Sequence, residues 1–213
     1  MLIGSKRTMT VQYTNRTGKT YYLREGKTKT GKPRYFFSSQ QNGKGEMVEH
    51  VPEGYEIYEH PENAQVFLRK KRPKIITDIE KHLVEKHVKQ LTRSKRYRVD
   101  CKDDCITIYE SDADIGELKG VLGDLLKHTP LRSGVTADEA MNTIVGAADQ
   151  HYTAMLRFRL VDKERRTFVA ERFCFRGAIE DWIFLGGPDD LKKLVGRYIR
   201  LLGTDKFFDS PYF

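Results

Sequence analysis

Cations interleaved with aromatic rings near the N-terminus are the residues of this sequence best suited to binding chemistry. Lysine and arginine can contact phosphates, and the flat faces of tyrosine and phenylalanine can stack on bases. The candidate nucleic-acid-binding residues are Tyr22, Arg24, Lys27, Lys29, Lys32, Arg34, Phe36, Lys70, Lys71, Arg72 and Lys74. The same composition also fits an ordinary amphipathic sheet, whose outer aromatic residues serve to pack across neighbouring strands.

Residues that could support catalysis or bind a metal are sparse. The segment Pro188 to Lys192 resembles fragments of a metal-dependent nuclease signature, but the fragments are fused in one stretch that suits the start of a helix. Cys101 and Cys105 lack a second Cys/His pair at zinc-binding spacing. We therefore expect no catalytic residues, no metal and no cofactor, and keep a metal-dependent nuclease as the third alternative.

The charge is divided unevenly along the chain. Residues 1–98 carry 22 Lys and Arg against 10 Asp and Glu, a net charge of +12. Residues 99–213 carry 16 against 20, a net charge of −4. Such asymmetry indicates a polyanion-binding face on the basic half, although a solubilising surface has the same composition.

The number of cysteines and the hydropathy limit the compartment. Three cysteines in 213 residues suit a reducing environment better than a disulfide scaffold. No apolar run reaches the roughly 18–20 residues that span a bilayer. We expect a soluble, cytoplasmic protein that makes no membrane contact. In a eukaryote, residues 70–74 would also match a nuclear import signal.

The candidate residues require strands to position them, and we assign residues 10–75 to a basic, antiparallel β-rich module. Residues 20–24 and 34–38 are rich in aromatic and β-branched side chains and predict a hairpin. Alternation puts Tyr22 beside Arg24 and Arg34 beside Phe36, each pair on one face. A second predicted hairpin, residues 55–69, is acidic and should be a poor phosphate contact.

Residues 76–213 form the second predicted domain. Thr77 and Glu80 make a capping-box pattern at the start of a helix that should run to about residue 91. A tight hairpin, helices before Pro130 and after Thr136, an antiparallel meander and a C-terminal helix should follow. The expected fold class is α+β: a small basic β-module joined by a short junction to a mixed domain with hairpins or a meander and three to four helices.

We therefore predict a non-enzymatic protein that binds DNA or RNA through its basic aromatic module, with the C-terminal half serving assembly or protein contacts. The alternative is a protein-interaction or accessory subunit of a larger complex, with a protein partner or self-association in place of nucleic acid.

Overall fold

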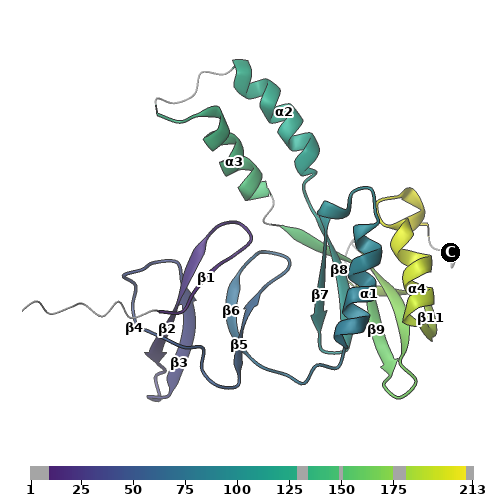
Figure 1. Cartoon of the computed structure of the whole chain (residues 1–213), viewed down its shortest axis with the longest axis horizontal. Helices are drawn as coiled ribbons and strands as arrows, with labels where there is room; N and C mark the ends of the chain where they lie inside the picture. The colour runs from purple at the N-terminus through teal and green to yellow at the C-terminus, as the bar shows by residue number, and fades with distance from the viewer. Residues whose placement is uncertain (1–9, 129–133, 149–150, 175–180, 210–213) are drawn as a thin grey trace, which may run out of the picture. The chain divides into compact units, whose positions relative to one another are not determined.

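The chain has an α+β fold, which confirms the predicted class (Figure 1). The structure is a computed structural model that describes residues 10–128, 134–148, 151–174 and 181–209. The chain divides into two compact units. Unit 1 comprises residues 1–72 and 131–150, and unit 2 comprises residues 73–130 and 151–213. No helix in the described ranges is long and apolar enough to cross a membrane.

Unit 1 is built around one central strand. Strand β2 (Thr20–Lys27) pairs antiparallel with β3 (Pro33–Ser38) on one side, and with β1 (Gln12–Thr14) and β4 (Glu46–Met47) on the other. Its residue Leu23 is fully buried. The predicted first hairpin is therefore confirmed as β2 and β3, in a register that puts Leu23 opposite Phe37.

The two turns that flank β2 have the same geometry and nearly the same sequence. The β1–β2 turn is Asn-Arg-Thr-Gly-Lys at residues 15–19, and the β2–β3 turn is Thr-Lys-Thr-Gly-Lys at residues 28–32. The fourth residue of each, Gly18 and Gly31, has φ of +79°, which favours glycine. The first side chain accepts a hydrogen bond from the fifth backbone N–H, at 2.9 Å in one turn and 3.1 Å in the other. Local sequence thus specifies both turns.

A second hairpin completes the sheet structure of unit 1. It consists of β5 (Tyr55–Glu59) and β6 (Val66–Lys70), close to the predicted bounds. Strand β6 lies against β3. Unit 1 also includes helix α3 (Ala137–Ala148), where Thr136 and Glu139 form a capping box that matches the predicted helix start.

Unit 2 is a five-stranded antiparallel meander in which each strand pairs with the next. This confirms the predicted hairpin and meander. The strands are β7 (Tyr97–Lys102), β8 (Cys105–Ser111), β9 (Tyr152–Asp162), β10 (Thr167–Cys174) and β11 (Asp181–Asp190). The last strand was expected over residues 178–185 and ends later, whereas residues 178–180 lie outside the described part of the chain.

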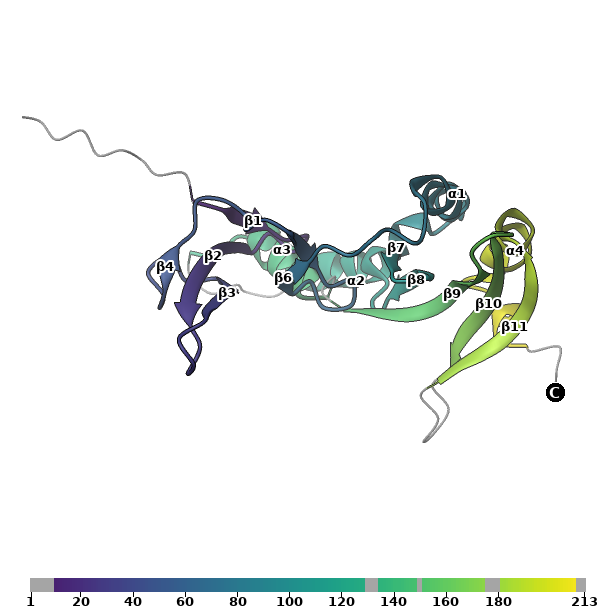
Figure 2. The same cartoon turned by 90° about the horizontal axis from the view of Figure 1, so that it is seen from below.

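Two helices bury one face of this sheet (Figure 2). Helix α1 (Asp78–Lys89) contributes Val84 and Val88, and α4 (Leu191–Tyr198) contributes Leu194 and Val195. The predicted capping box of α1 is confirmed, because Glu80 donates its N–H to the Thr77 hydroxyl and accepts the Thr77 N–H at 2.8 Å. Glu80 also pairs with Arg166 from the β9–β10 turn.

The remaining helical segments of unit 2 lie between or after these elements. They are α2 (Ile115–His128) and the short 3₁₀ helices η1 (Ser94–Arg96), η2 (Ile199–Leu201) and η3 (Asp205–Phe207). The core also includes Phe207 from η3, whose backbone oxygen accepts a 2.9 Å hydrogen bond from the buried Arg172.

Candidate nucleic-acid interface

The β2–β3 turn presents a group of exposed cations on a well-defined loop. Lys27, Lys29, Lys32 and Arg34 are all exposed. The loop is closed by the Thr28 N–H, which donates to the Lys32 carbonyl at 2.8 Å. None of these four cations forms an ion pair with any residue that the structure describes. Their charges are therefore available to a ligand, on a turn that requires little ordering.

The basic run that follows β6 lies at the same end of unit 1. Tyr35, next to Arg34, has its ring 6.2 Å from that of Tyr55, and Tyr55 lies opposite Lys70 across β5 and β6. The Lys71 N–H donates to the carbonyl just before β5 at 2.8 Å. The register thus brings two basic segments, far apart in sequence, to one end of the unit (Figure 1).

Arg72 and Lys74 continue the run with different placements. Arg72 is exposed and still belongs to unit 1. Lys74 is exposed in unit 2, where its ammonium group lies 3.0 Å from Asp78 in the first turn of α1. Arg72 lies beyond the paired residues of β5 and β6, so neither Arg72 nor Lys74 is part of the cation group defined by the register of unit 1. We name that group, Lys27, Lys29, Lys32, Arg34, Lys70 and Lys71, the basic end.

Arg24 does not lie on an exposed face, contrary to the sequence-based expectation. It is 3% exposed, and its guanidinium donates to the carbonyls of Gly43 and Gly45 at 2.9 and 2.7 Å and also to those of Gln40 and Gln41. A guanidinium has five donors in a fixed fork, so one side chain can organise a whole loop. Arg24 stabilises residues 40–45 and is not available to phosphates.

The predicted aromatic platform on the same face is also partly covered. Phe36 lies opposite Arg24 and is only half-exposed. Its ring atoms are 3.3 Å from the positions that a Cβ would take on Gly26 and Gly45, so the ring packs against backbone. Tyr22 is likewise half-buried, between β1 and β3. Phe36 thus packs against β2 and loop 40–45, and neither ring lies on an open stacking surface.

A stacked cation and ring occur instead on the second hairpin, where the sequence analysis did not look for them. The Arg69 guanidinium lies 3.8 Å from the centre of the Tyr58 ring, and Arg69 Nε donates to Glu56 at 2.7 Å. Phe67, opposite Tyr58, is 44% exposed. The sequence could have indicated this stack, because alternation along residues 56–58 and 67–69 puts Glu56, Tyr58, Phe67 and Arg69 on one face of the hairpin. Because Glu56 pairs with Arg69, this face adds little positive charge.

Two acidic residues of the second hairpin have structural partners, because Glu56 pairs with Arg69 and Glu59 with Arg16. Three others lie close to the basic end. Glu25 is half-buried opposite Tyr35, the exposed Glu46 lies opposite Glu25, and the exposed Glu53 precedes the residue whose carbonyl accepts the Lys71 N–H. The basic end is thus not free of negative charge, but its six cations outnumber these three acids.

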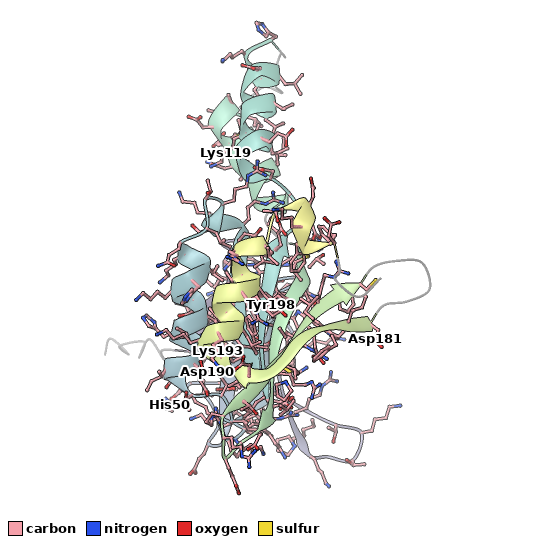
Figure 3. The ribbon with its side chains drawn as sticks, turned by 90° about the vertical axis from the view of Figure 1, so that its right-hand side faces the viewer. His50, Lys119, Asp181, Asp190, Lys193 and Tyr198 are labelled. Atoms are coloured by element: carbon pink, nitrogen blue, oxygen red, sulfur yellow. The ribbon has the colours of Figure 1, made fainter. Side chains whose placement is uncertain are left out.

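The stretch with the nuclease-like fragments is a helix start. Asp190 accepts the Lys192 N–H at 2.8 Å, and Asp189 accepts from Lys193 Nζ at 3.0 Å. Figure 3 shows Asp190 and Lys193 at the start of α4. The hydrogen bond from Lys193 lowers the pKa of Asp189. Among the described residues, no three His, Cys, Asp or Glu side chains gather as they would to hold a metal ion. Both aspartates of this stretch are therefore engaged at the start of α4.

The two neighbouring cysteines lie on opposite faces of the β7–β8 hairpin. Cys101 lies opposite Ile106 and packs towards the core, whereas Cys105 lies opposite Lys102. Burial raises the pKa of each thiol to about 12. The pair is thus a set of packed, protonated thiols and not a preformed chelating pair.

Comparison with known proteins adds no relative. No protein-family model matches the chain, and neither a curated protein nor a solved structure shows significant similarity to it.

Proposed function

We propose that this chain is a non-enzymatic nucleic-acid-binding protein, and that the basic end of unit 1 contacts the phosphates of DNA or RNA. The observation that carries the proposal is the gathering, at one end of a unit, of six exposed cations that form no ion pair with described residues. Phosphate contacts of this kind supply most of the affinity in sequence-independent binding.

The arrangement favours backbone contacts over base recognition. Five of the six cations are lysines, which act as flexible point charges, and only Arg34 has a fork that can bind two oxygens at once. Of the rings that could have stacked on bases, Phe36 packs against the backbone at Gly26 and Gly45, and Tyr22 is half-buried. The proposed ligand is therefore a phosphate backbone with little sequence preference.

The salt dependence of duplex binding tests this proposal. We expect a mixed-sequence duplex of about 20 base pairs to bind at low salt, with a log–log salt slope of up to about −5 if all six cations release counterions. Fluorescence anisotropy between about 50 and about 200 mM salt would measure this slope. Binding that is absent at low salt, or indifferent to salt, would reject the proposal.

Matched triple variants separate local contacts from net charge. Replacing Lys27, Lys29 and Lys32 with Gln should weaken duplex binding about tenfold or more and reduce the slope by roughly 3. Replacing three exposed lysines of unit 2 removes the same charge and should leave affinity nearly unchanged; these are Lys86, Lys89 and Lys163. Equal losses in both variants would mean that net charge alone drives binding.

A specific observation favours a second candidate function, that of an interaction subunit. Val121 and Leu125 on α2 are 63% and 57% exposed. Apolar side chains that adjoin on one helix face commonly mark a protein contact. Purification from the native host after nuclease treatment would distinguish the two functions: a stoichiometric protein partner that is lost from a Val121→Ser/Leu125→Ser variant would support the second.

A further inference from the structure

The sheet of unit 2 has a second face that differs in chemistry from its core. Helices α1 and α4 both pack on the first face (Figure 2). Among the described residues of unit 2, the second face is occupied by its own long side chains, mainly arginine and aromatic residues. They include Arg98, Tyr109, Arg157, Arg159, Glu171, Phe173, Trp182 and Phe184.

The centre of this face holds two arginines that share one carboxylate. Arg157 Nε donates to Glu171 Oε2 at 2.5 Å, and Arg159 Nη2 donates to Glu171 Oε1 at 2.9 Å. Glu171 is 7% exposed. Burial acts to raise its pKa, but the hydrogen bonds from Arg159 and Arg157 lower the pKa overall. The carboxylate is therefore ionised, and two guanidinium groups surround a single negative charge.

Aromatic rings continue the cluster towards the sheet edge. The Arg157 guanidinium lies 4.2 Å from the centre of the Trp182 ring, and Phe173 meets the same ring edge-on with centres 5.2 Å apart. Phe184 lies opposite Glu171 and is 47% exposed. An exposed ring beside a guanidinium plane is a combination that can bind unpaired bases.

The charges of the face balance. Arg98, Arg157 and Arg159 lie on it with Asp100 and Glu171, and the β7–β8 turn at its rim adds Lys102, Asp103 and Asp104. Stacking and cation–π contacts must therefore contribute more than phosphate attraction. This is the reverse of the basic end of unit 1, where charge is abundant and exposed rings are few.

We propose that this face of the β7–β11 sheet binds single-stranded nucleic acid. Phe184 would stack on a base beside the Arg157–Trp182 pair, and Arg159, whose side chain is 38% exposed, would contact a phosphate. Arg98 has a different role, because its guanidinium lies 4.8 Å from the centre of the buried Tyr152 ring. The site lies on different residues from the basic end, so it does not depend on the function proposed for unit 1. It extends that function from duplex phosphates to unpaired bases.

Trp182 is the only tryptophan of the chain, so its fluorescence reports directly on this face. We expect an oligothymidine or oligouridine of about 15 nucleotides, of the order of one binding site, to quench Trp182 saturably at low salt. Replacing Phe184 with Ala should weaken this binding at least about fivefold, the lower limit of base–aromatic stacking. A matched control is Phe208→Ala, which removes a ring that is 58% exposed and lies next to Phe207 on the core side.

Three outcomes would overturn the proposal. The first is an absence of quenching, and the second is an unchanged affinity in the Phe184→Ala variant. The third is equal quenching and affinity with oligoglutamate of the same length, which would identify an acidic-peptide site instead. The variant with Gln in place of Lys27, Lys29 and Lys32 keeps the two proposals distinct. It should lose duplex binding yet retain the quenching of Trp182. A loss of quenching would show that the oligonucleotide binds through unit 1 and would also overturn the proposal.

Discussion

Arg16 of the β1–β2 turn lies against Glu59 at the end of β5, with Nη1 and Oε1 2.8 Å apart. The same guanidinium donates to the carbonyls of His60 and Pro61 at 2.9 and 2.7 Å. The Tyr13 hydroxyl donates to the second oxygen of Glu59 at 3.0 Å. One arginine thus joins the turn before β2 to the turn between β5 and β6, at the opposite end of unit 1 from the basic end.

We expect the Arg16→Met variant to destabilise unit 1 by about 3 kcal/mol, because it leaves the largely buried Glu59 carboxylate without its counter-charge. The matched control is Arg69→Met, which breaks the more exposed pair with Glu56 and should cost about 1 kcal/mol or less. Both losses of stability can be measured by unfolding each variant in urea and monitoring the exchange of amide protons in unit 1. Equal costs would show that the Arg16 pair is not special.

Substitutions of Arg24 and Arg34 should have opposite effects, because Arg24 holds loop 40–45 in place whereas Arg34 is proposed to contact the duplex. Arg24→Met removes the donors that hold loop 40–45, so the amides of that loop should exchange faster, while duplex affinity falls little because the basic end remains. Arg34→Gln should lower duplex affinity without changing stability, since Arg34 is exposed and lacks an ion pair with described residues. Hydrogen exchange and anisotropy on the same samples would check both; the reverse pattern would contradict our assignment of the two arginines.

Local signals in the sequence predicted the elements better than the site. The capping box at Thr77 and Glu80 and the alternation in residues 152–160 each depend on neighbours within a few residues. The burial of Arg24 could not be predicted in this way, because loop 40–45 folds onto β2 from about 20 residues away. The stack of Arg157 on Trp182 joins β9 and β11 and depends on register shifts next to β10, which alternation alone does not reveal.

The overall charge of −4 in the second half also concealed its arginine-rich face. Acidic residues such as Asp189 and Asp190 are engaged at a helix start, on other parts of unit 2. Counting charges along a sequence averages over faces that folding separates. The alternation of residues in β9, which puts Arg157 and Arg159 on one side of the strand, was the available signal for this face.

Cys101 and Cys105 should behave as unreactive thiols. With each pKa raised to about 12 by burial, little thiolate exists at neutral pH, so alkylation of the folded protein should be far slower than of the unfolded protein. Because the folded pKa is raised, the thiols contribute stability below the ordinary value of about 9, and this is lost as the pH rises towards 12. Mass spectrometry after timed alkylation measures the rates.

Mild oxidation provides a second readout for these thiols. The two side chains lie on opposite faces of one hairpin, so no disulfide should join them while the sheet is intact. A Cys101–Cys105 disulfide that forms rapidly in the folded protein would contradict the register of β7 and β8.

Tyr198 of α4, labelled in Figure 3, lies so close to Gly186 that a single added methyl group should break the contact. The Tyr198 hydroxyl donates to the Leu185 carbonyl at 2.8 Å, and a Cβ on Gly186 would lie 2.2 Å from that hydroxyl oxygen. Gly186→Ala should therefore destabilise unit 2 by about 1–3 kcal/mol through overpacking. Tyr198→Phe removes the oxygen, so the double variant should cost less than the sum of the single variants.

Gly120→Ala in α2, where a Cβ meets nothing within 4 Å, should instead stabilise its helix by about 1 kcal/mol. Thermal unfolding of the four variants decides the point, and additivity between Gly186 and Tyr198 would show that the two residues do not touch.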